Sequence, residues 1–127
     1  MLIDTSAWIE YFMGTREGEK VRDVVESDRV LYTSPVIISE VLSKSIRTDG
    51  LEKGKERADF IAERCVVVPI DEEMGLLAGK IHGEMKARDK SFGMIDAIIL
   101  ATARRKKIKV LTKDRHFEGL EEAVMLE

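Results

Sequence analysis

The sequence contains no asparagine and no glutamine, and it has a single cysteine, Cys65. The lack of both amides, beside many Lys, Glu and Arg residues, is typical of proteins from heat-adapted sources. One cysteine excludes an internal disulfide. Because Cys65 precedes the apolar run Val66–Val68, we expect it to be a small buried residue in a reducing, intracellular compartment.

Long hydrophobic runs are also missing, since no stretch approaches the roughly 20 apolar residues of a membrane span. The first residues, Met1–Asp4, lack the basic region and the apolar stretch of a signal peptide. We therefore expect a cytoplasmic protein without membrane contact. Its 127 residues, 44% of them hydrophobic, predict one domain that covers residues 1–127. The net charge of −3 does not indicate a nucleic-acid binder, although it leaves room for a local basic groove.

Several common catalytic motifs are absent as well. The chain has no GxGxxG, no GxxxxGK[ST] and no GxSxG, which argues against a phosphate loop and against a serine hydrolase. Only two histidines are present, His82 and His116. We interpret His82 as a partly exposed residue of a long helix.

The most informative stretch runs from Phe92 to Asp114. Ile95–Ala103 is apolar almost all round, as expected for a helix buried in a core. Its first turn contains Asp96, and four cations, Arg104–Lys107, close it. A predicted interior strand, Ile108–Thr112, follows and Asp114 comes just after it. Singly, each aspartate is explained as a cap.

The rest of the chain alternates strands with helices. The predicted strands are Leu2–Ile3, Val30–Tyr32, Val66–Ile70 and Ala123–Leu126, the last at a sheet edge. The predicted helices are Ala7–Met13 with Ser6 as N-cap, Glu17–Glu26, Pro35–Arg47 after a Ser34 cap, Lys55–Arg64 after a polar loop over 48–54, and one from the cap Asp71 to Arg88. This alternation predicts a three-layer α/β fold with a mostly parallel sheet and helices on both faces.

Four acids interrupt apolar surroundings in this pattern: Asp4, Glu40, Asp96 and Asp114. Each can reach the carboxyl edge of the sheet, where open α/β folds build their sites. For Glu40 an exposed pair with Lys44 is the alternative. Clustered buried carboxylates need a cation, and oxygen ligands favour Mg²⁺ or Mn²⁺. The corresponding chemistry is metal-assisted hydrolysis of a phosphodiester.

The segments around these acids match a known family. They read LIDTSAWIEYF, TSPVIISEVL, FGMIDAIILATA and VLTKDRHF. In this order, over essentially the whole chain, the sequence resembles PIN-domain ribonucleases, specifically VapC-like toxins of prokaryotic toxin–antitoxin pairs.

The resemblance implies a PIN-like fold and a metal-dependent endoribonuclease that cuts RNA. Carried over by position, Asp4, Glu40, Asp96 and Asp114 would bind one or two Mg²⁺ or Mn²⁺ ions, with Ser6 and Thr112 as supporting hydroxyls. A homodimer and an antitoxin partner are implied too. Some relatives carry another acid soon after the Asp114 position, where this chain has Arg115–Phe117. This departure bears on whether a second metal is held.

For RNA contacts the sequence offers cations near the predicted groove. The candidates for contacts with the RNA backbone are Arg16, Arg88, Lys90 and Lys113. The alternative interpretation of each is an ordinary solvated surface charge. Trp8 and Phe117 are either base-stacking or core residues.

Two other functional interpretations remain open from sequence. One is an RNA-processing or structure-specific PIN nuclease without an antitoxin. The other is non-enzymatic: a phosphoacceptor domain, or a PIN-like fold that only binds a partner. A phosphoacceptor would need an adjacent acid pair after the first strand and a free aspartate after the third, whereas Asp4 stands alone and Asp71 is explained as a cap.

Overall fold

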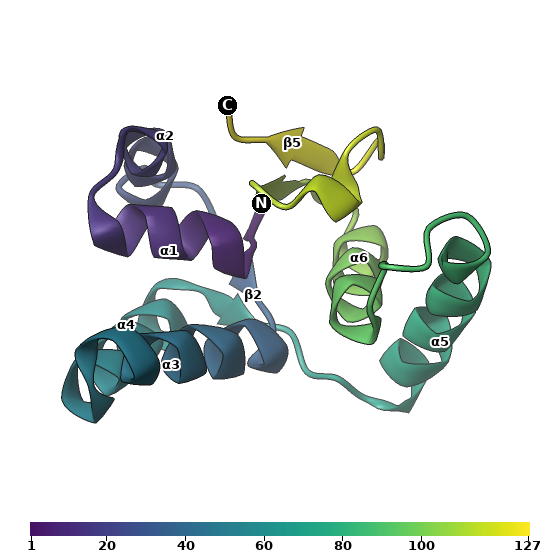
Figure 1. The fold of residues 1–127 in the computed structure, drawn as a ribbon, viewed down its shortest axis with the longest axis horizontal. Helices are drawn as coiled ribbons and strands as arrows, with labels where there is room; N and C mark the ends of the chain where they lie inside the picture. Colours follow the sequence, from purple (N-terminus) through teal and green to yellow (C-terminus); the bar gives the residue numbers. More distant parts are fainter.

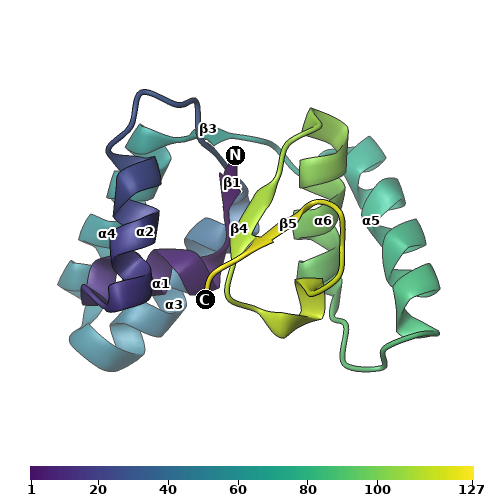
Figure 2. The same ribbon diagram turned by 90° about the horizontal axis from the view of Figure 1, so that it is seen from above.

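A computed structural model describes residues 1–127 and places five short strands in one parallel sheet. The spatial order is β3-β2-β1-β4-β5, with β1 at the centre (Figure 2). Their bounds are Leu2–Ile3 (β1), Tyr32–Thr33 (β2), Val66–Val67 (β3), Val110–Thr112 (β4) and Ala123–Met125 (β5).

Six α-helices cover the two faces of this sheet. α1 to α4 lie on one side and α5 and α6 on the other (Figures 1 and 2). The bounds are Thr5–Met13 (α1), Arg16–Val25 (α2), Pro35–Asp49 (α3), Leu51–Arg64 (α4), Glu72–Lys86 (α5) and Met94–Lys106 (α6), with a 3₁₀ turn, η1, at Arg115–Phe117. The predicted three-layer α/β class is confirmed. None of the helices is long and apolar enough to cross a bilayer.

The register of the central strands brings distant parts of the chain to the same edge. Leu2 pairs with Tyr32 on one side and with Val110 on the other, and Ile3 pairs with Leu111. Because all strands are parallel, the residues after β1, β2 and β4 emerge together at the carboxyl edge. That edge carries the residues of the site described below.

The stretch from α6 to β4 forms much of the core, as predicted. Ala97, Leu100 and Ala101 are fully buried, and Val110 of β4 is too. The first turn of α6 departs from the prediction, since Ile95 is 41% exposed. This turn lies at the sheet edge, where the core ends.

The predicted polar loop over 48–54 is wrong. α3 continues to Asp49 and α4 begins at Leu51, so that Gly50 alone joins them. Gly50 has φ +93°, a conformation that only glycine adopts readily. One residue can therefore reverse the chain and form a helical hairpin.

Strand boundaries also differ from the predicted ones. The third strand is only Val66–Val67, and Val66 is half exposed because β3 lies at the sheet edge. The second strand begins at Tyr32 instead of Val30, and the fourth at Val110 instead of Ile108. The last strand, β5, is an edge strand as predicted.

Trp8, Phe117 and Cys65 are core residues. Both aromatic rings are fully buried, and Trp8 contacts Tyr11, Phe12 and Phe60 through its ring. Burial raises the pKa of the Cys65 thiol to about 11, which leaves it unreactive at neutral pH.

Candidate active site

Asp4 follows β1 directly and is the N-cap of α1, so the prediction that Ser6 caps this helix is wrong. Asp4 is 4% exposed. Its Oδ1 accepts a hydrogen bond of 2.8 Å from the Thr5 backbone N–H, and its Oδ2 accepts one of 2.7 Å from Thr112 Oγ1. A short strand thus delivers an acid into the protein interior, where two neighbouring segments hold it.

Burial is the main influence on the Asp4 carboxyl and raises its pKa to about 6. The nearby charges of Asp114 and Glu40 act in the same direction, while the hydrogen bonds from Thr112 and Thr5 oppose it. The surroundings therefore disfavour the carboxylate form when no cation is present. A divalent cation would reverse this preference.

The hydroxyls of Ser6 and Thr112 connect the ends of β1 and β4. Ser6 Oγ lies 3.2 Å from Thr112 Oγ1 and 3.3 Å from Asp4 Oδ2, and it accepts a hydrogen bond from the Lys113 backbone N–H. Thr112 Oγ1 in turn accepts one from the backbone N–H of Asp114. Both residues thus lie where the supporting hydroxyls are expected, although their functional role stays a prediction.

Glu40 lies on α3 and faces the site. Thr5 Oγ1 donates a hydrogen bond of 2.7 Å to its Oε1. No ion pair with Lys44 forms, so the alternative interpretation of Glu40 as half of an exposed pair is wrong. Thr5, next to Asp4 in the chain, links this carboxylate to the first one.

Asp96 begins α6 as both a cap and an acid of the site edge. Its Oδ2 accepts a hydrogen bond of 2.9 Å from the Gly93 backbone N–H, which is the one half of a capping box that a glycine at the N-cap permits. Burial raises the pKa of Asp96, and the charge of Asp114 adds to that effect. Gly93 and the imidazole of His116 act in the opposite direction. The capping interpretation is correct, but it does not remove Asp96 from the cluster.

Asp114 and His116 complete the arrangement from the turn after β4. Asp114 Oδ1 accepts a hydrogen bond from the His116 backbone N–H and caps η1. The Nδ1 atom of His116 lies 3.3 Å from Asp114 Oδ1 and 2.9 Å from Asp96 Oδ2. Asp96, Asp114 and His116 thus offer ligand atoms that all lie within 4.8 Å of one another. Asp4 and Glu40 stand outside this tight group.

A divalent cation fits this set of residues. Asp96, Asp114 and His116 bring their ligand atoms together, and Asp4 lies close enough to Asp114 and Glu40 for their charges to raise its pKa. The buried Nδ1 atom of His116 forms no hydrogen bond. The carboxylate oxygens suit Mg²⁺ or Mn²⁺. Such an ion would also neutralise the charges that raise the pKa of Asp4.

A family model for the PIN domain matches residues 1–123 of the chain. The chain belongs to the PIN domain family. No curated protein matches it in sequence. The resemblance of its four acidic segments to PIN domains is therefore confirmed at the level of the family.

Solved structures share the fold of this PIN domain at low sequence identity. A toxin–antitoxin complex from Klebsiella pneumoniae has a TM-score of 0.79 and 20% identity, over 99% of this chain and 97% of that chain. DNA-bound VapBC from Salmonella typhimurium has a TM-score of 0.75 and 18% identity, over 98% of this chain and 94% of that chain. VapC20 of Mycobacterium tuberculosis has a TM-score of 0.74 and 19% identity, over 95% of both chains. It is described as a Sarcin-Ricin loop cleaving toxin.

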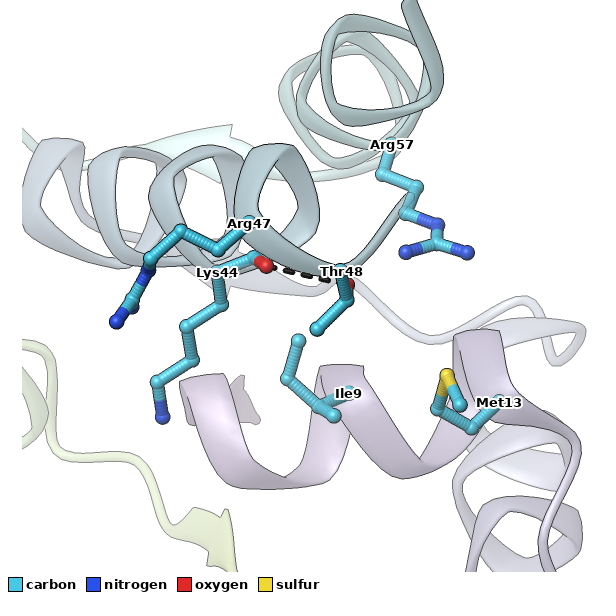
Figure 3. A pocket seen from close by; sticks show the side chains of 6 residues that line it. All are labelled: Ile9, Met13, Lys44, Arg47, Thr48 and Arg57. Carbon is cyan, nitrogen blue, oxygen red and sulfur yellow. Dashed lines mark hydrogen bonds between the residues drawn. The ribbon is translucent and has the colours of Figure 1, made fainter. Parts of the chain in front are cut away.

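A groove beside the acids carries cations that the sequence analysis did not select. A cavity of about 320 Å³ extends from Glu40 along α3 to Lys44 and Arg47. A second cavity, of about 350 Å³, shares Lys44 and Arg47 and is lined by Ile9, Met13, Thr48 and Arg57 (Figure 3). The spacing of Glu40, Lys44 and Arg47 along one helix face could have revealed this groove.

The predicted RNA-contacting cations differ in their pairing, and their contacts with RNA stay a prediction. Lys113 is paired with Glu10, while Arg16, Arg88 and Lys90 are exposed and form no ion pair. His82 is a partly exposed residue of α5, as predicted. Asp71 caps α5 and pairs with Arg105, which removes the free aspartate that a phosphoacceptor would need after β3.

Proposed function

We propose that this PIN domain is a metal-dependent endoribonuclease and the toxin of a type II toxin–antitoxin pair. The observation that carries the proposal is the convergence of Asp4, Glu40, Asp96 and Asp114 at the carboxyl edge of the sheet in a chain of this family. The reaction would be hydrolysis of an RNA phosphodiester.

The residues that would hold Mg²⁺ or Mn²⁺ are Asp4, Asp96 and Asp114, with Glu40 completing the shell directly or through water. The ion supplies a stronger water nucleophile and stabilises the charge that builds on the phosphate. Thr112 and Ser6 keep the Asp4 carboxylate in place through their hydroxyls. The Gly93 N–H fixes Asp96 in the same way.

The RNA backbone would follow the groove from Glu40 along α3. Lys44 and Arg47 line it and form no ion pair, so their charges are free to meet phosphates. Arg57 at the far end is already paired with Asp49 over 2.9 Å. The substrate path therefore rests on the two α3 cations rather than on Lys113.

The partners follow from the named neighbours. Their descriptions include toxin–antitoxin complexes and DNA-bound VapBC, which supports an antitoxin as the inhibitor of this chain. A homodimer is part of the same proposal, and sedimentation at tens of micromolar tests it. A pure monomer at that concentration would contradict the dimer but not the nuclease.

Purified protein tests the central claim. With Mg²⁺ or Mn²⁺ it should cleave RNA, and a chelator should stop the reaction. Asp96→Asn should lower the rate by roughly 10² or more, because charge stabilisation at the reacting centre is lost. Cleavage that persists undiminished in chelator would overturn the metal mechanism.

Matched controls are available elsewhere in the chain. Asp49 is paired with Arg57, and Asp71 caps α5; neither faces the acids. Asp49→Asn and Asp71→Asn should therefore keep nearly normal activity. A loss equal to that of Asp96→Asn would mean that the site lies at another edge.

A further inference from the structure

His116 stands among the acids of the site with an unsatisfied nitrogen. Its Nδ1 atom is buried and forms no hydrogen bond, although Asp96 Oδ2 lies only 2.9 Å away. That oxygen therefore lies off the direction in which a ring N–H would point. A buried nitrogen without a hydrogen bond is costly unless something else satisfies it.

The distances around Nδ1 match those between neighbouring ligands of one metal ion. Two ligands at right angles, each about 2.1 Å from an octahedral ion, lie about 3.0 Å apart. The separations from Nδ1 are 2.9 Å to Asp96 Oδ2 and 3.3 Å to Asp114 Oδ1. The turn η1 fixes His116 beside Asp114, because the Asp114 carboxylate accepts a hydrogen bond from the His116 backbone N–H and so caps the turn.

We propose that His116 is a direct nitrogen ligand of the ion held by Asp96 and Asp114, and that it makes the site prefer Mn²⁺ to Mg²⁺. The chemical reason is that imidazole binds transition-metal ions well, whereas Mg²⁺ favours oxygen. The inference rests on the proposed function only in that these acids bind a divalent ion.

Mn²⁺ itself is the probe, because its electron spin reports on nearby nitrogen nuclei. Electron spin echo envelope modulation of Mn²⁺ bound to the wild-type protein should show coupling to a ¹⁴N of imidazole. The loss of free Mn²⁺ signal in the same samples gives the dissociation constant. Neither readout depends on catalysis.

Three variants separate His116 from other sources of nitrogen. His116→Ala should lose the ¹⁴N modulation and bind Mn²⁺ about tenfold or more weakly, with a much smaller effect on Mg²⁺. His116→Glu, which supplies oxygen instead, should bind Mn²⁺ without the modulation and shift preference toward Mg²⁺. His82→Ala removes the other histidine, on α5, and should behave as wild type.

Circular dichroism and melting in chelator establish that each variant is folded, and the wild-type spectrum alone already tests for nitrogen. Mn²⁺ binding without ¹⁴N modulation overturns the inference. So does tighter Mn²⁺ binding by His116→Ala, because removal of a true ligand cannot strengthen the binding of its ion.

The failure of this inference can be told apart from failure of the proposed function. If Mg²⁺-dependent RNA cleavage is intact while His116→Ala leaves Mn²⁺ affinity and spectrum unchanged, only the ligand assignment is wrong. If the protein neither binds Mn²⁺ nor cleaves RNA, both are wrong.

Discussion

Thr112 Oγ1 donates a hydrogen bond of 2.7 Å to Asp4 Oδ2, and the two residues are 108 positions apart in the chain. The bond joins the end of β4 to the end of β1 at the centre of the sheet. Thr112 is fully buried, and its hydroxyl also accepts from the Asp114 backbone N–H. One hydroxyl thus positions two acids of the site.

Thr112→Val should test this link, because valine keeps the shape but removes the hydroxyl. Asp4 Oδ2 and the Asp114 N–H would both lose a partner in a buried place, at a cost of about 1–3 kcal/mol in unfolding free energy. The pKa of Asp4 should rise further, since Thr112 now lowers it. Urea unfolding and an NMR titration of Asp4 measure the two effects.

Thr33→Val is the matched control. Thr33 is fully buried on the neighbouring strand β2, and its hydroxyl has no hydrogen-bond partner. Its replacement should be neutral or stabilising. Equal losses for Thr33→Val and Thr112→Val would show that the Asp4 bond contributes nothing particular.

Stability of the metal-free protein should fall as the pH rises through about 6. The folded-state pKa of Asp4 is raised from 3.8 to about 6, so the folded protein holds this proton more tightly than the unfolded chain. The stabilisation is complete below about pH 4 and is lost as the pH rises through 6, up to about 3 kcal/mol in all. Denaturant unfolding in chelator from pH 4 to 8 measures it.

Asp4→Asn provides the comparison for the pH series. Without a titrating group at this position, the decline between pH 4 and 7 should be much smaller. Saturating Mn²⁺ should oppose the decline in the wild-type protein, because a cation binds the carboxylate form. A wild-type curve that rises with pH in chelator would contradict the assigned direction of the pKa shift.

Asp96 should respond differently to two substitutions. Asp96→Asn keeps an oxygen that accepts from the Gly93 N–H. It removes a carboxylate whose charged form is disfavoured by burial, as the raised pKa of Asp96 indicates. The variant should therefore melt a few degrees higher than wild type in chelator. Asp96→Ala also loses the cap and should melt lower. Thermal melts in chelator measure both.

Mn²⁺ should reverse the order of wild type and Asp96→Asn. At about 100 times its dissociation constant the ion adds roughly 2.7 kcal/mol to a protein that binds it only when folded, and the variant should gain much less. If Asp96→Asn melts lower in chelator and gains as much from Mn²⁺ as wild type does, Asp96 is a cap and not a ligand.

Lys44 and Arg47 should contribute to RNA affinity through phosphate contacts. A double substitution to alanine should weaken binding at all sequences and reduce the salt slope of a single-stranded RNA by about 1.4, since each contact accounts for about 0.7. The slope is measured over a salt series with proteins that also contain Asp96→Asn, so that the RNA stays intact during the binding measurement.

The control for the groove removes the same charge from the opposite side of the sheet. Lys80 of α5 and Lys106 of α6 are exposed and form no ion pair. Their double alanine variant should leave the slope nearly unchanged. If both double variants lower the salt slope equally, the effect comes from net charge and not from the groove.

The sequence by itself determined the fold class and indicated four acids as the candidate site. Periodicity separated the buried helix α6 from the strand β4, and Pro35 after Ser34 marked the start of α3 as the structure has it. These features are local, because side-chain spacing and capping depend on neighbours in the chain. The resemblance to PIN domains rests separately on the residues of the four acidic segments and on their order in the chain.

The tertiary structure alone decided how the acids are held and which cations accompany them. Sequence could not show that Asp4 rather than Ser6 caps α1, that Thr5 reaches Glu40, or that His116 Nδ1 lies beside Asp96. The sequence also predicted a strand over Val66–Ile70, whereas the structure has only Val66–Val67. This strand lies at the sheet edge, and its place in the strand order is not a local property of the sequence. Such relationships join residues far apart in the chain, and only packing of the parallel sheet fixes their distances and burial.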